Sequence, residues 1–296
     1  MNPNVSSAPV TCDRVASRKM TLDVIIALIP ALIASIIIFG LRALLITALC
    51  VIVAVLAEFI FEKALKKPVT IGDLSAVVTG MLLAFCLPVS IPLWIAGLGS
   101  VVAIIVVKQL FGGIGQNFAT PALTARVILL ISFGMEMSNC TIDGVTSATP
   151  LAGVKVELMD LFLGNHAGSL GETCIVALLI GAIYLLVRKV ISWHIPVAYL
   201  VTVAVISLVT GENVLVHLMG GGLLLGAVFM ATDPTTSPKS GLCKIVYGVG
   251  CGLLTMMIRL LGTTAEGVSY AILLMNILTP HIEKLGAGKT AGGDAA

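Results

Sequence analysis

Charged residues are scarce in this sequence. Asp, Glu, Lys and Arg together make up 11% of its 296 residues, whereas an average soluble domain has about 25%. Hydrophobic residues account for 58% and the mean hydropathy is +1.11, so the composition predicts an integral membrane protein. The few basic residues are scattered among loops instead of forming one patch, which gives no indication of nucleic-acid binding.

The alternation of apolar and polar residues that marks membrane β-barrels is also missing. The apolar runs are continuous, and because lipid cannot hydrogen-bond the backbone, such runs must cross as helices. We therefore predict an all-α integral membrane protein. Metal-ligand spacing is absent as well: the seven cysteines form no Cys-x-x-Cys pair and no Cys/His cluster. This argues against a metal site or a complete active site built by this chain alone.

Ten apolar segments are long enough to cross a bilayer if tilt and some short crossings are allowed. They run over residues 22–39, 43–61, 74–87, 91–107, 119–133, 173–187, 195–209, 214–230, 245–261 and 267–278. The polar start of the chain lacks the pattern of a cleaved signal peptide, so the first segment is expected to remain as a helix.

The distribution of basic residues tests this count, because Lys and Arg are retained in cytoplasmic loops. With the N-terminus inside, most of the 17 basic residues are cytoplasmic: Arg14, Arg18, Lys19, Lys63, Lys66, Lys67, Lys108, Arg188, Lys189, Lys239, Lys244, Lys284 and Lys289. Arg42, Lys155 and Arg259 fall outside, and Arg126 falls within the fifth segment. We therefore expect an even number of crossings and two cytoplasmic termini.

A Pro-x-x-x-Pro element follows both the third and the eighth segment, at Pro88/Pro92 and at Pro234/Pro238. The chain thus reads as five spans plus five, and an odd repeat unit must be inserted upside down the second time. The alternative is that proline merely marks the starts of loops. The expected divisions are a cytoplasmic segment (1–21), a first repeat (22–134), an outer loop (135–172), a second repeat (173–282) and a flexible cytoplasmic tail (283–296).

Ionisable residues inside apolar segments are candidates for function, since each is costly in a bilayer. Arg126 is either such a residue or an arginine that snorkels to the inner surface. Glu58 is expected at the membrane interface beside Lys63, and His217 is expected to be a hydrogen-bonded histidine rather than a ligand. Asp233 either forms a turn or contributes to an ion pathway.

The segment "GGIGQNFATPALTAR", residues 112–126, combines glycines with Asn117, Thr120 and Thr124 just before a span. Glycines permit a ligand to approach the backbone, and a helix start offers unpaired N–H groups. The competing interpretation is a structural loop that leads into a helix with proline near its start.

The longest polar break contains "DGVTSATPL", residues 143–151. Small neighbours leave the hydroxyl of Thr149 open to a modifying enzyme, and the predicted topology places it on the outer face. The alternative is an ordinary polar loop with turn residues.

The stretch resembles the flavin attachment site of the NqrB/RnfD family, which supplies membrane subunits to the Rnf complexes and to sodium-translocating NADH:quinone oxidoreductase. "GGIGQNFATPALTAR", "GGGLLLGAVFMATDPTTSP" and "EGVSYAILLMNILTP" extend the resemblance along almost the whole chain. Ser147 stands where the family core usually has glycine. The chain lacks the long N-terminal extension of the quinone-reducing branch, so the resemblance is to the Rnf branch.

The resemblance implies an electron-carrying membrane subunit of a ferredoxin:NAD oxidoreductase that moves sodium ions or protons. A flavin transferase would esterify FMN through its phosphate to Thr149, and a noncovalent riboflavin would bind within the helices. Other Rnf subunits would be the partners, in a bacterial inner membrane. The rival interpretation is a solute channel without redox chemistry, because urea and ammonium channels also use five-plus-five repeats. A third is a structural anchor for the rest of the complex.

Overall fold

The computed structural model describes residues 14–113, 116–139, 141–142, 145–146, 158–164, 168–172, 174–262 and 267–290. Within these ranges the chain is helical apart from two strands of two residues each, β1 (Thr141–Ile142) and β2 (Val145–Thr146), which form an antiparallel hairpin. The prediction of an all-α fold holds for every other described element.

The first half of the sequence forms a group of helices that is interrupted at its third member. They are α1 (Arg14–Phe39), α2 (Leu41–Ala64), the short η1 (Ile71–Asp73), α3 (Ser75–Phe85), α4 (Leu93–Val101) with its π-helical continuation η2 (Val102–Gln109), α5 (Pro121–Ser132) and α6 (Gly134–Ser138). Helix α3 has 11 residues, about 16 Å at 1.5 Å per residue. It is therefore too short to cross a 30 Å hydrocarbon layer by itself.

The second half repeats this arrangement of long and short helices. It contains α7 (Leu158–Leu163), α8 (Ile175–Val187), α9 (His194–Thr210), α10 (Val214–Met219), α11 (Leu223–Leu225) with its π-helical continuation η4 (Gly226–Met230), α12 (Gly241–Leu261) and α13 (Val268–Thr290). The interruption again falls in the third long segment, where Gly221 and Gly222 adopt positive φ between α10 and α11. A left-handed backbone there suits glycine, which has no Cβ to clash.

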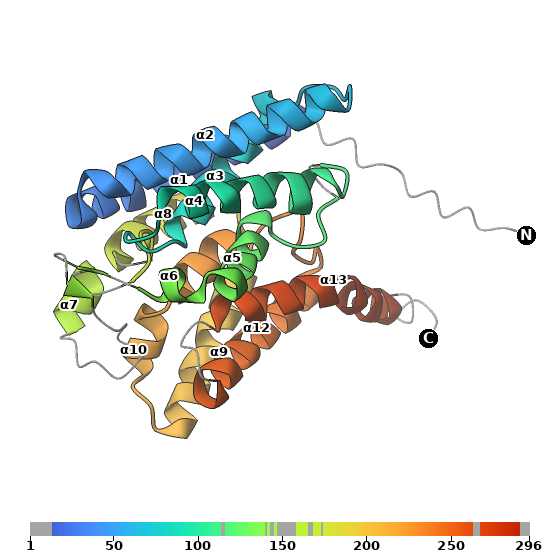
Figure 1. The fold of residues 1–296 in the computed structure, drawn as a ribbon. Coiled ribbons are helices and arrows are strands. Elements are labelled where there is room, and N and C mark those ends of the chain that lie inside the picture. Colours follow the sequence, from blue (N-terminus) through green and yellow to red (C-terminus); the bar gives the residue numbers. More distant parts are fainter. Residues whose placement is uncertain are drawn as a thin grey trace, which may run out of the picture.

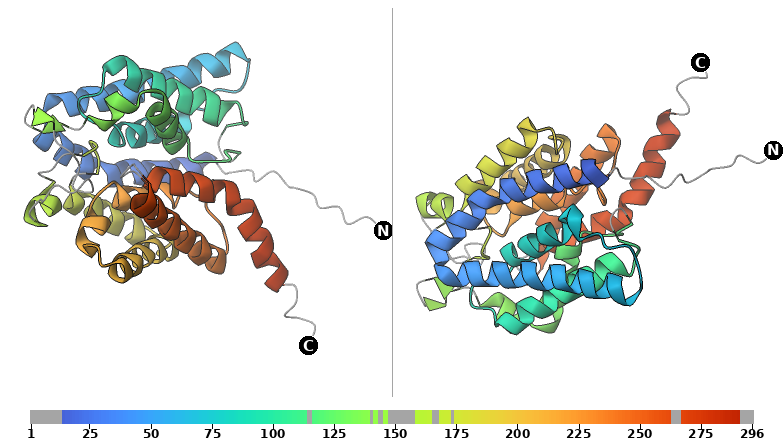
Figure 2. Two further views of the ribbon diagram at one scale, coloured as in Figure 1. Left: turned by 60° about the horizontal axis from the view of Figure 1, so that its bottom comes forward. Right: turned by 90° about the horizontal axis from the view of Figure 1, so that it is seen from above.

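The helices of each half pack mainly on one another, and a few pairs join the halves. Helix α2 packs on α3 and α4, and α9 packs on α12, while α1 contacts α8 and α5 contacts α13. In the left view of Figure 2, α1 lies between the remaining helices of the first half and those of the second. Asp23 of α1 fixes the first of these contacts, since it accepts hydrogen bonds from Tyr184 (2.9 Å) and Arg188 (3.3 Å) on α8.

The residues after α3 are held by a segment from far along the chain. The N–H of Leu170 donates to the carbonyl of Leu87 (3.0 Å), and that of Gly171 donates to the carbonyl of Phe85 (2.9 Å). These bonds satisfy carbonyls that the end of a helix leaves unpaired. The segment 168–172 therefore anchors the end of the interrupted helix.

Large apolar side chains cover the outside of the molecule, including Ile37, Ile60, Ile131, Val187 and Val209. An exterior of this kind suits lipid rather than water. Three helical stretches are long and apolar enough to cross a membrane by themselves, namely Ser17–Phe39, Leu41–Ala64 and Gly241–Leu261. Shorter apolar helices match further predicted spans at Ser75–Phe85, Leu93–Gln109, Pro121–Ser132, Ile175–Val187 and His194–Thr210.

Both ends of the described bundle point the same way. The start of α1 and the end of α13 lie on one side of the molecule, and α7 lies on the opposite side (Figure 1). The chain therefore returns to the side from which it enters.

Candidate functional site

A cavity lies among helices from both halves of the sequence and has a volume of about 150 Å³. Its polar lining comprises Ser17, Thr21, Ser75, Thr79, Lys108, Asn117, Thr120, Thr232, Asp233 and Thr235. Its apolar lining includes Val24, Val78, Leu82, Leu185, Val228 and Phe229. An apolar space with a few convergent polar groups is the usual form of a small-molecule site.

Asn117 and Thr120 reach the cavity from the loop before α5, as the ligand interpretation of this glycine-rich segment requires. Thr120 has an extended backbone and Pro121 opens the helix, which suits a first-turn proline because it needs no N–H donor there. The side-chain oxygen of Asn117 is buried and has no hydrogen-bond partner within the described structure. A buried orphan acceptor is costly, so this oxygen is suited to a donor group on a ligand.

Thr120 is also the point where the two halves of the sequence meet through polar contacts. Its hydroxyl lies 3.3 Å from the hydroxyl of Thr236 and 3.5 Å from the carbonyl of Met230. It also accepts a hydrogen bond from the side-chain amide of Asn276 at 3.1 Å. All three partners belong to the second half, so the loop before α5 is fixed against η4 and α13.

Asp233 forms a turn, as one of the two sequence interpretations proposed. Its carboxylate accepts hydrogen bonds from the N–H (3.1 Å) and the hydroxyl (2.9 Å) of Thr235. Burial raises the pKa of the Asp233 carboxyl above its ordinary value, while the bonds from Thr235 act in the opposite direction. Because Asp233 also lines the cavity, its role in the turn leaves its carboxylate facing a ligand site.

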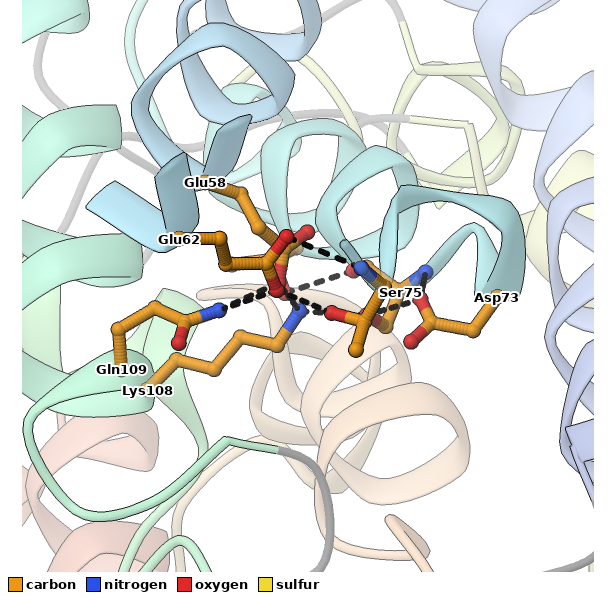
Figure 3. Close-up of polar contacts among 8 residues, drawn as sticks. Glu58, Glu62, Asp73, Ser75, Lys108 and Gln109 are labelled. Atoms are coloured by element: carbon orange, nitrogen blue, oxygen red, sulfur yellow. Dashed lines mark hydrogen bonds and ion pairs between the residues drawn. The ribbon is translucent and has the colours of Figure 1, made fainter. Parts of the chain in front are cut away.

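Lys108 and Glu58 form a buried ion pair next to the cavity (Figure 3). The ammonium of Lys108 lies 2.5 Å from a carboxylate oxygen of Glu58, and the two side chains are 2% and 0% exposed. The expectation that Glu58 lies at the interface beside Lys63 is therefore wrong, because helix packing turns Glu58 inward toward η2. The assignment of Lys108 to a cytoplasmic loop is also wrong, since Lys108 ends a buried helical segment.

More carboxylates surround this pair than Lys108 can neutralise. Gln109 donates to Glu58 (2.8 Å) and to Glu62 (3.3 Å), and Lys108 donates to the hydroxyl of Ser75 (2.5 Å). Asp73 accepts a bond from the same hydroxyl at 2.7 Å. Figure 3 shows these side chains converging from α2, α3 and η2.

One oxygen in this cluster has no partner. The second carboxylate oxygen of Glu58 is buried and accepts no hydrogen bond among the described residues. A buried carboxylate is stable only when it is paired and hydrogen-bonded. The cluster therefore has unsatisfied capacity for a proton or a small cation.

Arg126 is buried and points away from the inner surface, toward the segment 168–172. Its guanidinium lies 3.4 Å from the hydroxyl of Ser169, and only 5% of the residue is exposed. The snorkelling interpretation is therefore wrong. The N–H of Ser169 in turn donates to Glu172 at 3.0 Å, so Arg126 helps to fix the segment that anchors the end of α3.

Arg259 has a related role at the interruption in the second half. It donates to the carbonyls of His217 (2.7 Å) and Gly220 (3.0 Å) at the end of α10. His217 is buried, and its ring lies 4.0 Å from Glu212. No group of His, Cys, Asp and Glu that could hold a metal occurs in the part of the chain that the structure describes.

Thr149, the predicted attachment residue, lies outside the described residues, and so do Ser147 and Asp143. The hairpin of β1 and β2 is adjacent, with Thr141 opposite Thr146 and Ile142 opposite Val145.

The Glu58–Lys108 pair was missed in the sequence. A usable signal was present: Glu58 and Glu62 are one helical turn apart, and both lie next to apolar runs that a charge interrupts only at a cost. The partner could not be read off, because Lys108 is 50 residues further along the chain.

Together, these features define a multi-pass helical membrane protein with a partly polar cavity enclosed by helices from both halves of the sequence. The chain belongs to the NQR2, RnfD, RnfE family, whose model matches residues 4–292.

Three curated relatives illustrate the similarity, and each is the D component of its complex. The chain is 48% identical to that of the Na(+)-translocating ferredoxin:NAD(+) oxidoreductase complex of Acetobacterium woodii, over 96% of this chain and 93% of that protein. It is 40% identical to that of the proton-translocating ferredoxin:NAD(+) oxidoreductase complex of Clostridium ljungdahlii, with 95% and 93% covered. It is 35% identical to that of the ion-translocating oxidoreductase complex of Stutzerimonas stutzeri, with 94% and 92% covered.

Proposed function

We propose that this chain is the electron-carrying RnfD component of an ion-translocating ferredoxin:NAD oxidoreductase complex. One observation carries the proposal: the cavity holds polar groups suited to a flavin ring and is bordered by the buried Lys108–Glu58 pair. Similarity over nearly the whole chain to the matching component from two organisms supports it. The other subunits of the complex are its partners, and the hydride chemistry with NAD belongs to one of them.

The cavity is our candidate site for noncovalent riboflavin. A void of about 150 Å³ accommodates one aromatic ring, and the cavity has this volume. Asn117 would accept a hydrogen bond from the ring edge, and the hydroxyls of Thr79 and Thr120 would donate to it. A bound flavin supplies one- and two-electron transfer. The protein contributes the orientation of the ring and the exclusion of water.

Lys108 connects the cavity to the carboxylate cluster. Its ammonium would stabilise negative charge in the cavity, and this competes with its attraction to Glu58, because unit charges a few ångströms apart interact strongly in a buried site. When Lys108 is shared in this way, Glu58 would take up a proton or sodium ion on its unpartnered oxygen. Asp233 remains a candidate for the ion path, and Arg126 is a weaker one because it fixes the 168–172 segment.

We propose ten crossings in a bacterial inner membrane, arranged as two inverted repeats (22–134 and 173–282). The residues before and after the repeats, 1–21 and 283–296, would be cytoplasmic, and the loop 135–172 would lie outside. The common side of the ends of α1 and α13, opposite α7, supports this arrangement. So does the similar interruption of the third long segment in each half.

Thr149 would carry FMN through a phosphoester bond formed by a flavin transferase on the outer face. The test is to express the chain with the transferase and to look for flavin fluorescence in a denaturing gel. We expect a fluorescent wild-type band that disappears in Thr149→Ala. Thr146→Ala is the matched control, because it removes a nearby threonine of the same loop, and it should stay fluorescent.

A wild-type band without fluorescence would contradict the attachment and favour the solute-channel alternative. If the chain is only a structural anchor, Thr149→Ala should leave electron flow through the complex unchanged, whereas an electron carrier should lose it.

A further inference from the structure

A chain of buried hydrogen bonds leads from the cavity into the second half of the protein. The hydroxyl of Tyr247 on α12 donates to the side-chain oxygen of Asn276 on α13 at 2.5 Å. The amide nitrogen of Asn276 donates to the hydroxyl oxygen of Thr120 at 3.1 Å. The three residues are 0%, 2% and 3% exposed, so water does not compete for these contacts.

The direction of these bonds determines what Thr120 can do. Because Tyr247 occupies the amide oxygen of Asn276, the NH₂ group must face Thr120. A threonine hydroxyl has one proton to give, and since Thr120 accepts from Asn276, its own proton must go elsewhere.

Within the described structure, the available acceptors for that proton are distant. They are the hydroxyl of Thr236 at 3.3 Å and the carbonyl of Met230 at 3.5 Å, whereas O–H···O bonds are usually about 2.7–2.8 Å. Thr120 lines the cavity, so a ligand there that offers an acceptor can receive this proton at a better distance.

We propose that Tyr247 and Asn276 are positioning residues that make Thr120 a hydrogen-bond donor to an acceptor edge, a carbonyl or ring nitrogen, of the ligand in the cavity. This inference rests on the proposed riboflavin site and adds the residues that set the polarity of one of its contacts. Neither residue touches the cavity, so both act through Thr120.

The experiment uses the purified complex stripped of noncovalent flavin, to which riboflavin is added while its fluorescence quenching gives a dissociation constant. Tyr247→Phe removes one hydroxyl and keeps the ring. The amide of Asn276 is then free to turn its oxygen toward Thr120 and take its proton. Loss of one such hydrogen bond should raise the dissociation constant about tenfold. Thr120→Val should have a similar effect, and Thr120→Ser should restore binding.

Tyr199→Phe is the matched control. Tyr199 is equally buried and its hydroxyl lies 2.5 Å from that of Thr255, but neither residue belongs to the chain that ends at Thr120. We expect this variant to bind riboflavin like the wild type. Equal weakening by both tyrosine variants would overturn the proposal.

The double variant separates a positioning role from a merely structural one. If Tyr247 acts through Thr120, Tyr247→Phe adds nothing in the Thr120→Val background, since residues of one network are not additive. The same tenfold effect in both backgrounds would reject the proposal. A wild-type complex that binds no riboflavin would instead contradict the proposed function. Normal binding by Thr120→Val, with a functional wild type, would overturn this inference alone.

Discussion

At the scale of single residues, the site depends on charges that packing has moved out of the places where the sequence puts them. Lys108 follows an apolar run and counts as a cytoplasmic charge along the chain, yet only 2% of its side chain is exposed. Its burial is possible because Glu58 and Ser75 both receive hydrogen bonds from its ammonium. A buried charge with such partners is a candidate for function rather than for anchoring the membrane.

The Glu58–Lys108 pair predicts a non-additive effect on stability. Glu58→Leu leaves the lysine buried without its counter-charge and should lower the free energy of unfolding by about 3–5 kcal/mol. Glu58→Leu combined with Lys108→Met replaces both charges by apolar groups and should recover most of that loss. Denaturant titration in detergent measures the difference.

Glu212→Leu is the control for this pair, because the side chain of Glu212 is 55% exposed. Its effect should stay within about 0.5 kcal/mol. A double variant as unstable as Glu58→Leu alone would show that the pair is not the reason for the loss.

At the scale of elements, the apolar segments were predictable and their interruptions were only partly so. Continuous apolar runs predicted helices at α2, α9 and α12, because lipid leaves the backbone no other choice. The shortness of α3 was visible in its length and in the prolines that follow. Its anchoring by residues 168–172 was not, since backbone hydrogen bonds between segments about 85 residues apart leave no local pattern.

The polar residues near Thr120 show the same limit. The glycines, Asn117 and Thr120 indicated a ligand site from local chemistry alone. The contacts with Thr236 and Asn276 depend on how α13 and η4 pack against α5. Sequence patterns report which residues are available, whereas packing decides which of them meet.

Helix α3 packs closely on α2 through Gly80, which predicts the result of adding a single methyl group. A Cβ at Gly80 would lie 2.8 Å from the Cα of Val51 and 2.9 Å from the carbonyl of Cys50, both backbone atoms. Overpacking of this kind costs about 1–3 kcal/mol, so Gly80→Ala should lower the thermal midpoint by several degrees.

Gly97→Ala is the matched control, because a Cβ at Gly97 meets only a side-chain atom of Val53, at 4.0 Å. It should leave the thermal midpoint unchanged or raise it slightly, since alanine favours helices. Equal midpoints for the two variants would mean that α3 and α2 separate more easily than the structure indicates.

At the scale of the whole molecule, the proposed topology places two native cysteines on opposite faces of the membrane. Cys12 belongs to the proposed cytoplasmic segment and Cys140 to the proposed outer loop. A membrane-impermeant maleimide added to intact cells should modify Cys140 and leave Cys12 unmodified until the cells are opened.

Variants that replace each of these cysteines by serine identify the labelled site. Cys50, Cys86, Cys243 and Cys251 are buried and should remain unreactive throughout. Labelling of Cys12 from outside would invert the proposed orientation and would place Thr149 on the cytoplasmic face.

The most direct test of the account is the amount of riboflavin that acid releases from the purified complex, per copy of this chain. A site in the cavity predicts one riboflavin per chain in the wild type and in Thr149→Ala, which loses only the covalent FMN. It also predicts a large loss in Asn117→Leu, which removes the buried acceptor from the lining. Riboflavin that is absent from the wild type, or retained in full by Asn117→Leu, would contradict the claim that this cavity is a flavin site.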